Sequence, residues 1–109
     1  MRTERKSDAQ KQLESITGGP LTLGRLLQAI RQGEDWSLAD MGKKLGVTRA
    51  FISALENGKA LSPMRAARYA RKLGYSESQF VRLALQDELA RAGLKYRVGL
   101  DEAHEASTP

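Results

Sequence analysis

Residues 38–58, LADMGKKLGVTRAFISALENG, restrict what this chain can fold into more than any other stretch. Their apolar residues recur at helical spacing in two short runs. Gly42 and Gly46 fall where two helix backbones need a close approach or a left-handed backbone angle. The stretch therefore predicts two short amphipathic helices that cross steeply at a tight turn.

Capping residues predict the same boundaries. Ser37 precedes the first helix with Asp40 three residues later, which is the spacing of a capping box, and Thr48 precedes the second helix. Because Ile52 and Leu55 form the buried edge of the second helix, its other side chains point away from the core. Such a pair fits the major groove of DNA as a helix-turn-helix. An ordinary helical hairpin that binds no nucleic acid is the alternative.

The basic side chains are concentrated in the middle of the chain, which has a formal net charge of +5 over 109 residues. Residues 21–75 hold 10 Lys and Arg against 4 Asp and Glu, whereas residues 1–20 and residues 76–100 each hold 4 against 3. A concentrated positive field of this kind attracts DNA phosphates. A solvated surface without an acidic partner is the alternative.

Several function classes lack their sequence signals. The chain has no cysteine, no signal peptide at its start and no apolar run of membrane-spanning length, so we expect a cytoplasmic protein without disulfides. No paired carboxylates, phosphate loop or ligand cluster is evident. The sequence therefore predicts no enzyme, no metal site and no cofactor.

Three further helices are predicted around the central pair, and the last of them is unusual. Its apolar residues cover more than half of its circumference, which is wider than a core-facing stripe requires. Part of it is expected to meet another chain, with full burial in its own domain as the alternative. The three helices run from about Leu23 to Gln32, from Pro63 to about Leu73 and from Glu77 to about Ala92.

Residues 94–100 alternate apolar and polar side chains after Gly93, and this pattern favours a strand. A lone strand must pair with a second copy, pair with another protein, or stay irregular. The residues expected at this dimer or partner interface are Phe80, Val81, Leu85, Leu89, Tyr96 and Val98.

The predicted organisation has four parts. A flexible arm covers residues 1–20, a helix-turn-helix domain residues 21–75, a helix and strand for dimer or partner contacts residues 76–100, and a disordered acidic tail residues 101–109.

The segment SLADMGKKLGVTRAFISALENGKALSP resembles the Cro/C1-repressor type (XRE family) of helix-turn-helix domain, most specifically in KKLGVTRAFISALENGK. The resemblance covers roughly residues 22–74 and implies an all-α domain of five helices that binds double-stranded DNA. It also implies that the helix from Thr48 to Asn57 is the recognition helix. Many members carry glutamine at the position of Leu38, and that glutamine supports contacts to a phosphate or to the recognition helix. The side chain of Leu38 cannot make these contacts.

Arg49 is expected to read guanine through two hydrogen bonds, with a phosphate contact as the alternative. Phe51 is expected either to pack beneath the helix or to touch a thymine methyl group. Ala50 and Ala54 let the helix approach the groove. The full set of expected DNA-binding residues is Ser37, Lys43, Thr48, Arg49, Ala50, Phe51, Ser53, Ala54, Asn57 and Lys59.

A single helix-turn-helix reads only a few base pairs, so we expect a homodimer on a palindromic operator. The sequence thus predicts a transcriptional repressor. The chain also looks like the HigA-type antitoxins of toxin–antitoxin pairs, and this resemblance implies autoregulation and a toxin protein as a further partner. A plain phage-type or restriction-modification regulator without a toxin partner is the alternative.

Overall fold

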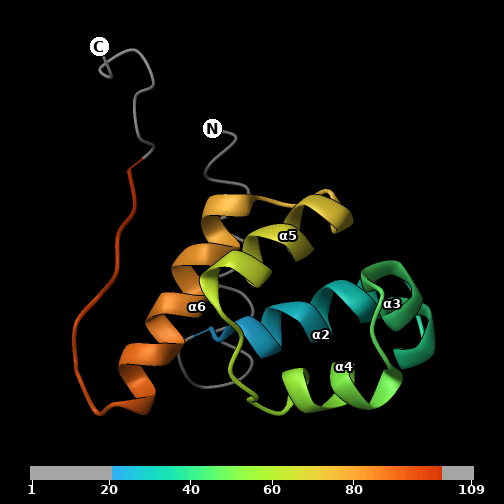
Figure 1. Ribbon diagram of the computed structural model, residues 1–109, viewed down its shortest axis with the longest axis horizontal. Helices are drawn as coiled ribbons and strands as arrows, with labels where there is room; N and C mark the ends of the chain where they lie inside the picture. Colours follow the sequence, from blue (N-terminus) through green and yellow to red (C-terminus); the bar gives the residue numbers. More distant parts are fainter. Residues whose placement is uncertain (1–20, 102–109) are drawn as a thin grey trace.

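The computed structural model describes residues 21–101, which contain five helices and no strand (Figure 1). This confirms the predicted all-α fold. The predicted arm at residues 1–20 and all but the first residue of the predicted tail lie outside the described residues. The helices are α2 (Leu23–Gly33), α3 (Leu38–Leu45), α4 (Arg49–Glu56), α5 (Pro63–Leu73) and α6 (Glu77–Arg91).

Each described helix begins after a serine or threonine that caps it. In every case the side-chain oxygen accepts a hydrogen bond from the backbone N–H three residues later, which satisfies one of the free donors of the first turn. At Ser37 the Asp40 carboxylate also accepts from the Ser37 N–H, so the predicted capping box is present. The caps are Thr22, Ser37, Thr48, Ser62 and Ser76.

One hydrophobic core joins all five helices. α2 lies in the middle of the molecule and packs against α4 and α6, while α3 packs against α4 and α5, and α5 lies along α6 (Figure 1). The helix-turn-helix and α6 therefore share one core. The largest fully buried side chains are Leu27, Met41, Ile52, Leu55, Tyr69, Phe80 and Leu83.

Gly24 allows α2 and α4 to touch. A β-carbon at this position would collide with the carbonyl oxygen of Leu55, a backbone atom that cannot move aside alone. The first turn of α2 therefore lies directly against the last turn of α4.

The wide apolar surface of α6 is only partly absorbed by the core. Phe80 is 1% exposed, so it packs within its own chain and offers no surface to a partner. Tyr96, by contrast, is 68% exposed. The other residues expected at the partner interface, Val81, Leu85, Leu89 and Val98, are half-buried.

Residues 94–100 form no strand but run back alongside α6 (Figure 1). Gly93, with a φ of 75°, reverses the chain, and the Leu94 N–H closes the turn on the Leu89 carbonyl at 2.9 Å. The Gln86 side chain then holds the returning segment through two hydrogen bonds to its backbone. A strand needs a second strand to pair with, and the described residues supply a glutamine amide instead.

Candidate nucleic-acid interface

The first turn of α4 faces solvent because the opposite edge of the helix is anchored. Ile52 is 0% exposed and Leu55 2% exposed. With these two side chains in the core, the start of the helix is left on the surface. Thr48, Arg49 and Ala50 are exposed, and Phe51, Ser53 and Ala54 are half-buried.

The turn before α4 depends on two glycines. Gly46 has a φ of 76°, in the left-handed region that other residues rarely adopt. A β-carbon on Gly42 would lie 2.6 Å from the Val47 carbonyl oxygen, closer than real contacts allow. Both predicted roles, a left-handed angle and a close approach, are therefore present. Together they let the chain turn sharply between α3 and α4.

An ion pair fixes the last turn of α4. Arg31 in α2 donates from Nε to Glu56 Oε2 at 2.6 Å and from Nη2 to Oε1 at 3.1 Å, and its Nη1 donates to the Trp36 carbonyl at 3.1 Å. The side chains are only 16% and 6% exposed. The hydrogen bonds to Glu56 raise the pKa of Arg31 above its ordinary value. This pair spans 25 positions, so no local spacing in the sequence indicated it.

Phe51 packs against the core and lies beside two cations. The Arg65 guanidinium carbon is 5.1 Å from the centre of the Phe51 ring, and Lys59 Nζ is 5.8 Å from it. Arg65 also donates to the Tyr69 hydroxyl at 3.0 Å. The ring therefore holds two positive charges near the exposed end of α4, which is an arrangement that the sequence reasoning did not identify.

The polar residues expected to meet DNA are partly engaged within their own helices. Ser37 Oγ and Thr48 Oγ1 accept capping bonds, which leaves their O–H groups able to donate. Asn57 Nδ2 donates one hydrogen bond to the Ser53 carbonyl at 2.8 Å, so the second N–H of this amide group can still donate. These groups can still reach a phosphate oxygen.

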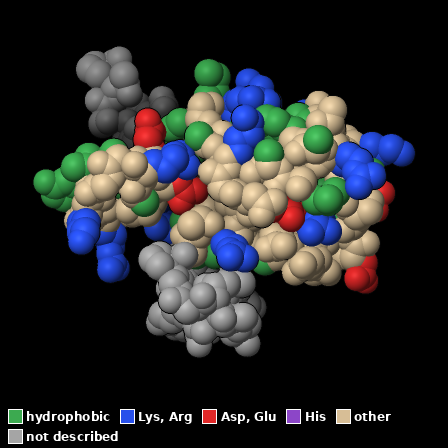
Figure 2. Space-filling model, turned by 90° about the horizontal axis from the view of Figure 1, so that it is seen from below, with side chains coloured by type: hydrophobic (Ala, Val, Ile, Leu, Met, Phe, Trp, Pro, Cys, Tyr) green, Lys and Arg blue, Asp and Glu red, His purple; other side chains and the backbone are tan. Residues whose placement is uncertain are grey.

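Basic side chains surround α4. Lys43 and Lys59 are exposed, and Figure 2 shows the α4 side of the molecule with Lys and Arg side chains spread across it. An open hollow near the end of α4 adds Arg25 and Gln28, which sequence reasoning had not assigned to the interface. The hollow is lined by Thr22, Arg25, Gln28, Glu56, Asn57 and Gly58.

Two apolar residues that precede α4 in the chain pack against the core. Leu38 and Trp36 are half-buried and pack against it. The Trp36 ring also carries Lys44 Nζ at 4.8 Å from its centre. Leu38 contributes an apolar contact where many related domains carry glutamine.

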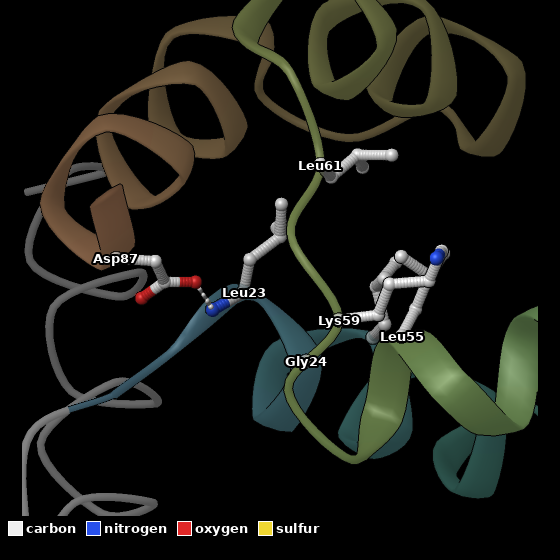
Figure 3. A pocket seen from close by; sticks show the side chains of 7 residues that line it. Leu23, Gly24, Leu55, Lys59, Leu61 and Asp87 are labelled. Atoms are coloured by element: carbon white, nitrogen blue, oxygen red, sulfur yellow. Dashed lines mark hydrogen bonds between the residues drawn. The ribbon is translucent and has the colours of Figure 1, made fainter. Parts of the chain in front are cut away.

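Asp87 ties α6 to the start of α2. Its Oδ2 accepts a hydrogen bond from the Leu23 N–H at 3.1 Å, and Figure 3 shows the carboxylate pointing at the first turn of α2. Burial raises the pKa of Asp87. The adjoining cavity measures about 10 Å³, room for about one water molecule, so it is not a ligand site.

Within residues 21–101 no group of acidic or histidine side chains could hold a metal ion, and no helix is long and apolar enough to cross a membrane.

Comparison with known proteins agrees with this geometry. The family model described as helix-turn-helix matches residues 27–80, from the middle of α2 to the first turn of α6. No curated protein and no solved structure matches the chain. Through residues 27–80 the chain belongs to the Cro/C1-type helix-turn-helix family, whose members are DNA-binding transcription regulators.

Proposed function

We propose that this protein is a transcriptional repressor that binds a palindromic operator as a homodimer, with α4 inserted in the major groove. One observation carries the proposal. Arg49 and Ala50 stand exposed at the start of α4, while Ile52 and Leu55 hold the same helix in the core. A rigid helix with an outward first turn is what base reading needs.

In this proposal Arg49 reads a guanine, since its fork of donors matches the guanine O6 and N7 acceptors. Ala50 and Ala54 admit the helix to the groove, and Ser53 contacts a base or a phosphate. The surrounding basic and polar side chains fix the register on the duplex through phosphates, which carry no sequence information. These positioning residues are Ser37, Lys43, Thr48, Asn57 and Lys59, to which we add Arg25 and Arg65.

The operator can be found by selection from a pool of random duplexes with the full chain. We expect enrichment of an inverted repeat whose half-sites lie about 34–36 Å apart, one helical turn. Arg49→Ala serves as the matched variant, and it should still bind DNA but lose most of the enrichment. Recovery of unrelated sequences by the natural chain would refute operator recognition.

A second function, neutralisation of a toxin protein together with autoregulation, is supported by the apolar side chains left exposed after α6. Leu94 is 47% exposed, Tyr96 68% and Leu100 42%, and such a group favours a protein partner. Co-expression with the product of a neighbouring short reading frame tests this function. Growth rescued only in the presence of this chain supports an antitoxin, whereas no toxic neighbour leaves a plain regulator.

A further inference from the structure

The segment after α6 has one backbone edge that is already occupied. Gln86 Nε2 donates to the Tyr96 carbonyl at 2.6 Å, and the Val98 N–H donates to Gln86 Oε1 at 2.8 Å. The N–H and C=O groups of one residue in a neighbouring strand would make the same pair of bonds. Residues 96 and 98 therefore turn their backbone groups toward α6.

The opposite edge of the segment is open. Backbone groups alternate in direction along an extended chain, so the N–H and C=O groups of Lys95, Arg97 and Gly99 point away from Gln86. No hydrogen bond among residues 21–101 reaches these groups. An exposed edge of this kind is a template for another strand.

We propose that this edge pairs with the same edge of a second copy, forming a two-stranded antiparallel ribbon with its twofold axis at Val98. The proposal rests on the dimer assumed in the proposed function and specifies how that dimer is joined. A closed twofold contact uses the same patch on both subunits, and here it places an α6 helix on each outer side of the ribbon.

Charge favours this register over the two that are centred on Arg97 and Tyr96. With the axis at Val98, Lys95 lies opposite the partner's Asp101, and Arg97 lies opposite the partner's Gly99. An axis at Arg97 sets two arginines against each other, and an axis at Tyr96 sets Lys95 against the partner's Arg97. Like charges directly opposite destabilise a ribbon, whereas opposite charges stabilise it. Of these three registers, only the one centred on Val98 pairs opposite charges. An axis at Gly99 would also pair opposite charges, Arg97 with the partner's Asp101, but it would set Tyr96 opposite the charged Glu102 of the partner sequence.

The apolar side chains agree with the same register. Tyr96 then lies opposite the partner's Leu100, and Val98 lies opposite its own counterpart. Directly opposed side chains in an antiparallel pair share one face, so the exposed surfaces of Tyr96 and Leu100 cover each other. The pairing thus buries side chains that a single copy leaves in solvent.

Single cysteines test the register, because the chain has no cysteine of its own. Val98→Cys should form a disulfide-linked dimer under mild oxidation, since the two α-carbons would lie about 4.5 Å apart. Arg97→Cys and Tyr96→Cys should stay unlinked, because a two-residue or four-residue offset separates their α-carbons by more than the roughly 7 Å that a disulfide spans. Preferential linking at residue 96 or 97 would overturn the proposed register.

Charge exchange tests the contact without cysteine. Lys95→Asp should weaken dimer association several-fold in sedimentation equilibrium of the full chain, and adding Asp101→Lys should restore it. The control combines Lys95→Asp with Glu88→Lys. It has the same net charge as the first double variant but lacks the opposed charges at positions 95 and 101, so it should not restore dimer association. Equal restoration by both second changes would contradict a direct Lys95–Asp101 contact.

Operator binding separates this inference from the proposed function. If the natural chain selects an inverted repeat as a dimer but Val98→Cys does not link and the charge exchange has no effect, the ribbon is refuted while the proposed function stands. If Val98→Cys forms the linked dimer but the natural chain selects no DNA sequence, the proposed function fails and the ribbon stands.

Discussion

Arg31 and Glu56 join the two helices that decide how α4 is presented. The contact is a bidentate pair with distances of 2.6 and 3.1 Å, and both side chains are largely shielded from solvent. Because Glu56 is the last residue of α4, this pair and the anchoring of Ile52 and Leu55 fix the helix from its C-terminal part. The first turn is then free to project outward.

Glu56→Gln should therefore destabilise the protein by about 3 kcal/mol, since it leaves the shielded Arg31 charge without its counter-ion. Urea unfolding measures the loss. Arg71→Gln is the control, because the Arg71–Glu77 pair is 59% and 53% exposed and should contribute no more than about 1 kcal/mol. Equal losses in the two variants would contradict a special role for the Arg31–Glu56 pair.

Arg49→Ala should weaken operator binding by about 1–3 kcal/mol and random-duplex binding by less. Arg49→Lys keeps the charge but loses the paired donors, so it should retain random-duplex affinity and lose discrimination. Fluorescence anisotropy at two salt concentrations measures the affinity for the operator and for the random duplex. Arg91→Ala is the control for a charge outside the interface. Equal losses on both duplexes would assign Arg49 to a phosphate contact.

Gly42→Ala should lower the thermal midpoint. Alanine gains up to about 1 kcal/mol of helix propensity over glycine, but its β-carbon would press on the Val47 carbonyl. Overpacking of this kind costs about 1–3 kcal/mol, so a net loss is expected. Gly33→Ala is the matched control in α2, where nothing lies within 4 Å of the new carbon, and it should leave stability unchanged or improve it. A Gly42 variant as stable as the Gly33 variant would refute the close approach.

Asp87 should make folding stability fall as pH rises. Its folded-state pKa lies above the ordinary value of 3.8, because burial penalises the charged carboxylate. Its stabilising contribution is therefore complete below about pH 3.8 and is lost as pH rises through the higher folded pKa. Asp40 acts in the opposite sense, since its bond with the Ser37 backbone N–H lowers its pKa, and its contribution is lost at low pH.

The Asp87 effect can be isolated with Asp87→Asn, which keeps an oxygen to accept from the Leu23 N–H. Subtracting the unfolding free energy of this variant from that of the natural chain at each pH cancels Asp40 and the other groups. We expect the difference to decline as pH rises above the ordinary pKa of 3.8. A difference that rises with pH would show that the Leu23 hydrogen bond outweighs burial.

Local chemistry in the sequence was enough to predict the helices, their caps and the turn. Capping depends on residues three positions apart, and amphipathic stripes on residues three or four apart, so both can be followed along the chain. The helix ends moved by only one residue, to Gly33 in α2 and to Arg91 in α6. Gly42 and Gly46 could be placed for the same reason, because each acts on a neighbouring turn.

Only the tertiary structure decided which distant residues meet. Arg31 and Glu56 are 25 positions apart, and Leu23 and Asp87 are 64 apart. Such pairs depend on the angles at which helices cross, and those angles follow from the packing of the whole core rather than from any run of residues. The segment after α6 illustrates the difference: its alternation favoured a strand, whereas the reversal at Gly93 and the position of Gln86 decided which of its edges stayed open.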